Sequence, residues 1–80
     1  MQTTNTTLRT VVTANVMTTL NTEQLSRAVD ELLEAMKTPD PDNPGLWSTN
    51  IDERQVWGIL DEGAGPGGEN LLTILFPEDY

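Results

Sequence analysis

The chain has 80 residues, of which 36% are hydrophobic, and it contains neither cysteine nor histidine. It can hold one small domain, and disulfides, Cys/His zinc sites and imidazole catalysis are excluded. Thirteen acidic residues against four basic ones give a net charge of -9, which disfavours direct contact with nucleic acid or an anionic membrane. With no apolar stretch of bilayer length, we expect a soluble, cytoplasmic protein.

The first twenty residues are rich in threonine and carry a single charge, at Arg9. From Leu8 to Leu20 the even-numbered residues are mostly apolar and the odd-numbered ones mostly polar, an alternation that predicts a strand. A disordered tail is the alternative. We therefore divide the chain into a threonine-rich segment, residues 1–16, that is a disordered tail or an edge strand, and one small domain, residues 17–80.

Residues 21–37 have the pattern of an amphipathic helix. Apolar side chains recur there at spacings of three and four residues, at Leu25, Ala28, Val29, Leu32, Leu33 and Met36. Asn21 with Gln24 three residues later has the spacing of a capping box. The proline-rich residues 38–45 cannot continue the helix.

Two uncharged runs, residues 55–60 and 71–76, flank a loop rich in glycine and predict a β-hairpin. The rival is a short helix from about Asn50 to Gly63, which Gly58 and the neighbouring β-formers disfavour. The predicted fold class is therefore α+β, with one amphipathic helix packed on a small antiparallel sheet. The sheet would contain this hairpin and possibly the N-terminal segment as a third strand; a mostly helical small domain is the alternative.

The hairpin would be apolar on both faces, although one helix can cover only one of them. Trp57, Ile59, Leu71 and Leu75 would share one face, and Val56, Leu60, Leu72, Ile74 and Phe76 the other. Small cores are commonly completed by association, so we expect a homodimer, with the N-terminal segment folding back or a different protein as the alternatives. The predicted interface residues are Trp57, Ile59, Leu71, Leu75 and Phe76.

Two short motifs resemble ligand sites only in part. Residues 63–68 are rich in glycine like a phosphate loop, but acids precede them and no lysine is near, so we expect a flexible turn. Residues 40–45 contain part of a calcium-loop pattern without its closing glutamate. We expect no catalytic residues, no metal and no cofactor, and hence no enzyme.

The charge and the absence of catalytic groups favour a small acidic interaction or regulatory module that binds a basic surface of a partner protein. The residues predicted to contact that partner are Glu31, Glu34, Glu78, Asp79 and Tyr80. The alternative is a nucleic-acid mimic that inhibits a DNA- or RNA-binding protein. It would use the short row of carboxylates along the helix, at Glu23, Asp30, Glu31 and Glu34.

Overall fold

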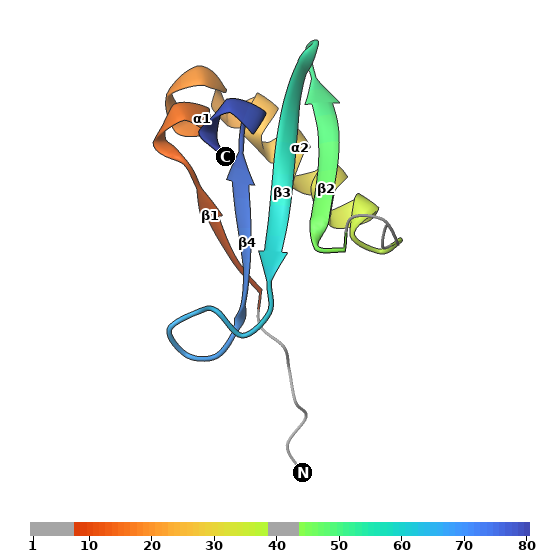
Figure 1. Cartoon of the computed structure of the whole chain (residues 1–80). Coiled ribbons are helices and arrows are strands. Elements are labelled where there is room, and N and C mark those ends of the chain that lie inside the picture. The colour runs from red at the N-terminus through yellow and green to blue at the C-terminus, as the bar shows by residue number, and fades with distance from the viewer. Residues whose placement is uncertain (1–7, 39–43) are drawn as a thin grey trace.

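The computed structural model describes residues 8–38 and 44–80 and has an α+β fold (Figure 1). One long helix packs on a four-stranded sheet, so the predicted α+β class is confirmed and the mostly helical alternative is wrong. The sheet is mixed and not purely antiparallel as predicted, because its N-terminal strand is parallel to its neighbour. The elements in chain order are β1 (Leu8–Val12), α1 (Ala14–Thr19), α2 (Thr22–Ala35), β2 (Leu46–Ile51), β3 (Arg54–Asp61), β4 (Asn70–Leu75) and the 3₁₀ helix η1 (Pro77–Asp79).

The strands lie in the order β1-β4-β3-β2, with β2, β3 and β4 antiparallel and β1 parallel to β4. The predicted C-terminal hairpin is the β3-β4 pair. The register pairs Trp57 with Leu75 and Leu60 with Leu72, and partners in register point to the same side of a sheet. The two predicted sets of apolar side chains therefore lie on opposite faces.

Helix α2 begins where the sequence predicts. The Asn21 side chain accepts a hydrogen bond from the backbone of Gln24 at 2.7 Å, and the Gln24 side chain accepts one from the backbone of Asn21 at 3.0 Å. This capping box satisfies donors that the first turn leaves unpaired. The Gln24 amide also donates to Asp52 at 2.8 Å, so the same residue ties the helix to the turn between β2 and β3.

The core lies between α2 and one face of the sheet, and Gly58 sets how closely they approach. A Cβ atom at Gly58 would lie 3.2 Å from a methyl group of Leu32 and 3.3 Å from one of Leu72. Leu32, Leu72 and Ile74 are all 0% exposed. Leu32 therefore fills the space that any other residue at position 58 would occupy. Leu33, which the sequence pattern placed on the same apolar stripe, is instead 37% exposed.

The N-terminal alternation holds only for β1, because residues 14–19 form a helix in place of a longer strand. The Thr13 side chain accepts a hydrogen bond from the backbone of Val16 and caps this helix. Val16 and Leu20, four residues apart, both enter the core with α2. Residues that the sequence assigned to a separate N-terminal segment thus supply an edge strand and the fully buried Val16. Residues 1–7 lie outside the described part of the chain.

Strand β2 was not predicted from the sequence, and the rival helix from about Asn50 to Gly63 is wrong. β2 and β3 are joined by Asp52 and Glu53, whose φ angles are 51° and 69°. Two positive φ angles are typical of a two-residue type I′ hairpin turn, which normally contains Asn or Gly. Contacts of Asp52 with α2 offset the backbone cost. Gln24 donates to its carboxylate, and Arg27 lies 3.2 Å from it.

Truncation of Leu32 tests the packing of α2 on the sheet. We expect Leu32→Ala to lower the free energy of unfolding by about 2–5 kcal/mol, because it leaves a cavity above Gly58. Leu33→Ala removes the same atoms from the same helix at a partly exposed position and should cost about 1 kcal/mol or less. Urea denaturation measures both variants. Equal losses would show that α2 does not pack through the face assigned to it.

Candidate functional site

The face of the sheet opposite α2 is the main apolar surface that no helix of the described residues covers. The register brings Trp57, Ile59, Leu71 and Leu75 together on this open face. Beside them lie the apolar Val11 and Leu46 and the polar Arg9, Ser48 and Thr73. Phe76 lies on the other side and is 0% exposed in the core. Four of the five predicted interface residues thus share one face, but Leu75 is only 5% exposed there, and Phe76 is enclosed on the other side. Their role as an interface stays a prediction.

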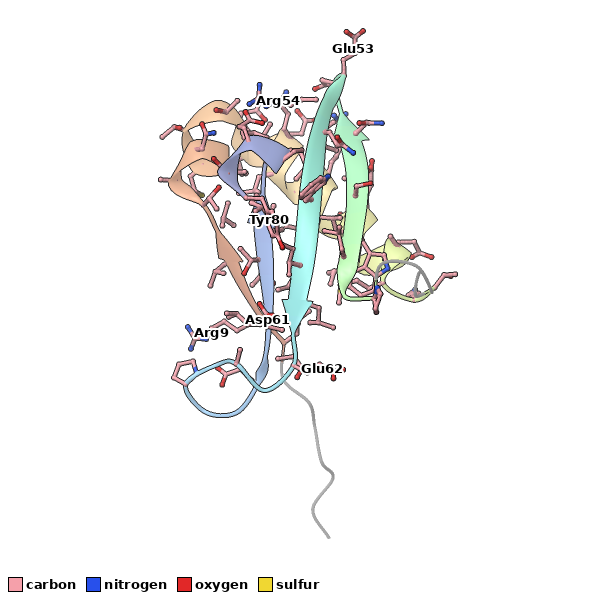
Figure 2. The ribbon with its side chains drawn as sticks, viewed as in Figure 1. Arg9, Glu53, Arg54, Asp61, Glu62 and Tyr80 are labelled. Carbon is pink, nitrogen blue, oxygen red and sulfur yellow. The ribbon has the colours of Figure 1, made fainter. Side chains whose placement is uncertain are left out.

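Tyr80 covers part of the open face (Figure 2). Its ring meets Trp57 edge to face, with 5.8 Å between the ring centroids and 67° between the planes, while Tyr80 itself is 85% exposed. Such an arrangement is favourable for two aromatic rings. Tyr80 therefore stays largely in solvent while its ring touches that of the half-buried Trp57.

The two acids before Tyr80 are held within the chain. The Asp79 carboxylate accepts hydrogen bonds from Thr13 and from Asn15, both at 3.0 Å, and from the backbone of Phe76 at 3.2 Å. The Asn15 amide is the main cause that lowers the pKa of Asp79 below its ordinary value. Glu78 forms an ion pair of 2.6 Å with Arg54. Arg54 in turn lies over the Phe76 ring, 3.9 Å from its centroid.

The two predicted partner-binding residues on α2 also have partners in the chain. Glu31 accepts a hydrogen bond from Thr49 of β2, and Glu34 pairs with Lys37 at 3.2 Å. Among the predicted partner-binding residues that the structure describes, Tyr80 is therefore the most available. These acids were predicted from their density along the chain. That density does not reveal which carboxylates already have hydrogen-bond or ion-pair partners in the fold.

All four basic side chains form ion pairs within the described residues. Each of the four basic residues lies within 3.2 Å of a carboxylate, in the pairs Arg9–Glu69, Arg27–Asp52, Lys37–Glu34 and Arg54–Glu78. Such exposed pairs add little stability, about 0–1 kcal/mol each. Of the eleven carboxylates in the described residues, these pairs use four, and seven have no cation partner there. The described surface therefore carries an excess of negative charge, although the four paired basic side chains are themselves partly exposed.

Asp61 and Glu62 are two of these seven, and they border the apolar surface. Figure 2 shows them at the end of β3, away from the turn that carries Glu53. A depression of about 310 Å³ on the open face is lined by Leu46, Trp57, Ile59, Tyr80 and Asp61 among others. A second one, of about 520 Å³, lies beside it and is lined by Met36, Trp47, Asp61 and Glu62 among others. The sequence analysis treated Asp61 and Glu62 only as residues that precede a turn.

The glycine-rich loop is built around its own carboxylate. Glu69 accepts hydrogen bonds from the backbone of Gly67 at 2.7 Å and from Arg9 at 3.0 Å. Its own backbone N–H is the main cause that lowers its pKa, followed by Arg9. A Cβ atom at Gly65 would lie 2.5 Å from the Glu69 side chain, so a larger residue there would displace this carboxylate. The backbone N–H groups of Gly65 and Gly67 thus donate to Glu69, and that of Gly63 donates to Asn70, instead of pointing to a phosphate.

The described residues contain no group of three acidic side chains placed to hold a metal ion. Most of the partial calcium-loop pattern falls in residues 39–43, outside the described residues. Across residues 8–38 and 44–80, neither helix is long and apolar enough to cross a bilayer.

No known protein family matches the chain, and neither a curated protein nor a solved structure is significantly similar to it. Its function therefore has to be argued from the chemistry of its surface.

Asp79 provides a test of the contacts that hold the C-terminal residues. Its pKa is lowered in the folded state, so the carboxylate contributes stability above its ordinary pKa of about 3.8. That contribution is lost as the pH falls through the lowered value. We expect Asp79→Asn to be less stable than the parent protein near neutral pH, and the difference to shrink below about pH 3.8. Urea denaturation across pH measures it.

Asp61→Asn is the matched control, because no hydrogen-bond donor of the described residues reaches the Asp61 carboxylate. This variant should not lose stability relative to the parent protein near neutral pH. A constant difference between Asp79→Asn and the parent at all pH values would contradict the contacts assigned to Asp79.

Proposed function

We propose that the protein is a small non-enzymatic interaction module that binds a basic surface of a partner protein. The observation that carries this proposal is the pairing of all four cations within the chain, while seven described carboxylates have no cation partner among the described residues. A surface with an excess of one charge attracts an oppositely charged partner over several ångströms and speeds the encounter. The same negative charge repels nucleic acid and anionic lipid.

The contact surface that we propose is the open face together with Asp61 and Glu62. It combines a sheltered tryptophan, an exposed tyrosine and two carboxylates at one end, and aromatic anchors with a charged rim are typical of protein interfaces. The long apolar stems of lysine and arginine suit such a surface, because they can pack on the rings while their charged ends reach the carboxylates.

A second copy of the chain fits this surface less well than a basic partner. Trp57, Ile59 and Leu71 are only partly exposed, so the fold does not require a second copy of the chain to bury them. Two copies would each carry a net charge of -9 and would bring the same acidic end into a shared interface. We therefore assign the open face to a partner, with the homodimer as the alternative outcome of the experiments.

Charge-neutralising variants test the location of the contact surface. The probe is a capped oligolysine peptide, and its binding is measured by calorimetry at low and at moderate salt. We expect the double variant Asp61→Asn/Glu62→Gln to weaken binding about five- to tenfold, because two rim charges are removed. Binding to the parent protein should weaken as the salt concentration rises.

The matched control is Glu23→Gln/Asp30→Asn, which removes the same number of charges from exposed positions on α2. It should change the affinity by no more than about twofold. Equal effects of the two double variants would mean that the peptide responds only to net charge, and would remove the proposed surface.

A further inference from the structure

The outer side of β2 presents unpaired backbone groups. The backbone N–H of Leu60 donates to the carbonyl of Gly45 at 2.8 Å, and the register pairs Trp47 with Gly58 and Thr49 with Val56. Hydrogen-bonded pairs alternate along antiparallel strands, so Trp47, Thr49 and Ile51 face β3 with their N–H and C=O groups. The same groups of Leu46, Ser48 and Asn50 point away from the sheet. No other strand of the described residues pairs with them, because β2 is an edge of the sheet.

This edge lacks the usual features that prevent strand pairing. Natural edge strands are commonly protected by charged residues, proline or bulges. β2 has the sequence LWSTNI, with no charge and no proline, and it pairs regularly with β3. The opposite edge strand, β1, carries Arg9. Of the two edges, β2 is therefore the better template for an added strand.

Carboxylates without a cation partner among the described residues surround this uncharged edge. Glu31 of α2 reaches Thr49 in the middle of β2, on the helix side of the sheet. Glu53 lies in the turn that follows β2, and Asp61, at the end of β3, lines the same depressions as Gly45, which precedes β2. The two depressions described above both include Pro44 and Gly45, the residues that lead into β2. An added strand would thus lie near carboxylates at its middle and at both ends, and near the two depressions at one end.

A second copy is poorly suited to this edge. If two β2 strands paired about a twofold axis, the two α2 helices would lie on the same side of the joined sheet, and Glu31 of one copy would approach Glu31 of the other. Like charges facing one another oppose association. A basic segment instead gains from every carboxylate around the edge.

We propose that the partner contributes an extended basic segment that adds to β2 as a fifth strand. Its alternate side chains would point to the two faces of the sheet. Lysine or arginine on the helix side would reach Glu31, and apolar residues on the other side would extend the open face beside Leu46. This inference rests on the proposed function and specifies the form of the partner.

The test uses a capped peptide in which lysine alternates with valine, and the same peptide with its backbone nitrogens methylated. Methylation keeps the charges and side chains but removes the donors that strand pairing needs. We expect the methylated peptide to bind at least about tenfold more weakly, and the unmodified peptide to shift the amide resonances of Leu46, Ser48 and Asn50. Equal binding of both peptides would overturn strand addition but leave the proposed function standing. Absence of binding by either peptide would overturn both.

A pair of variants tests the same edge from the side of the protein. Ser48→Pro removes an outward N–H while leaving the bonds to β3 intact, as proline does on natural edge strands. We expect Ser48→Pro to bind the unmodified peptide about tenfold more weakly than the parent protein does. Ser48→Ala keeps the N–H and should bind this peptide with the affinity of the parent protein. Cooperative unfolding of Ser48→Pro would confirm that it folds, and the methylated peptide serves as the test if it does not. A dimer of the protein alone that Ser48→Pro dissociates would assign the edge to a second copy and overturn the basic segment.

Discussion

The structure depends on the close approach of one helix to one face of the sheet. Gly58 has no side chain, so Leu32 can reach the middle of the sheet, and the capping box of α2 fixes where that helix begins. Because α2 packs on one face only, the side chains on the other face of the sheet are left without a covering long helix. A single long helix encloses Leu72, Ile74 and Phe76, while the side chains that alternate with Ile74 and Phe76 face outward. The chain shelters part of that second face with its own Tyr80.

The elements that could be predicted from the sequence are those defined by local patterns. The amphipathic period of residues 21–37 and the two apolar runs around a glycine-rich loop predicted α2 and the β3-β4 hairpin. β2 was missed because Asp52 and Glu53 do not resemble the residues that usually form a two-residue turn. Their backbone conformation is supported by Gln24 and Arg27, which are distant in sequence. The predicted N-terminal strand was too long because the cap by Thr13 and the burial of Val16 depend on the core.

The acidic character was evident from composition, but the site was not. Counting charges pointed to Glu31, Glu34, Glu78 and Asp79. Glu34 and Glu78 are ion-paired and Asp79 is held by hydrogen bonds, whereas Glu31 is bonded only by the neutral Thr49 and keeps its charge. The fold instead leaves Asp61 and Glu62 beside an apolar depression and an uncharged strand edge. Which carboxylates remain for a partner is set by tertiary contacts, and a single sequence does not contain that information in readable form. Phe76 is a similar case. The alternation of side chains along a strand predicts which face it lies on, but its burial depends on contacts with Arg54 and the core.

Amide hydrogen exchange along β2 tests the central claim, that this acidic domain keeps one strand edge open for a partner. Amides bonded to a neighbouring strand exchange slowly, and amides that face solvent exchange quickly. For the protein alone we predict slow exchange at Trp47, Thr49 and Ile51 and fast exchange at Leu46, Ser48 and Asn50. Uniform slow exchange along the whole strand would show that the edge is already occupied and would contradict the account.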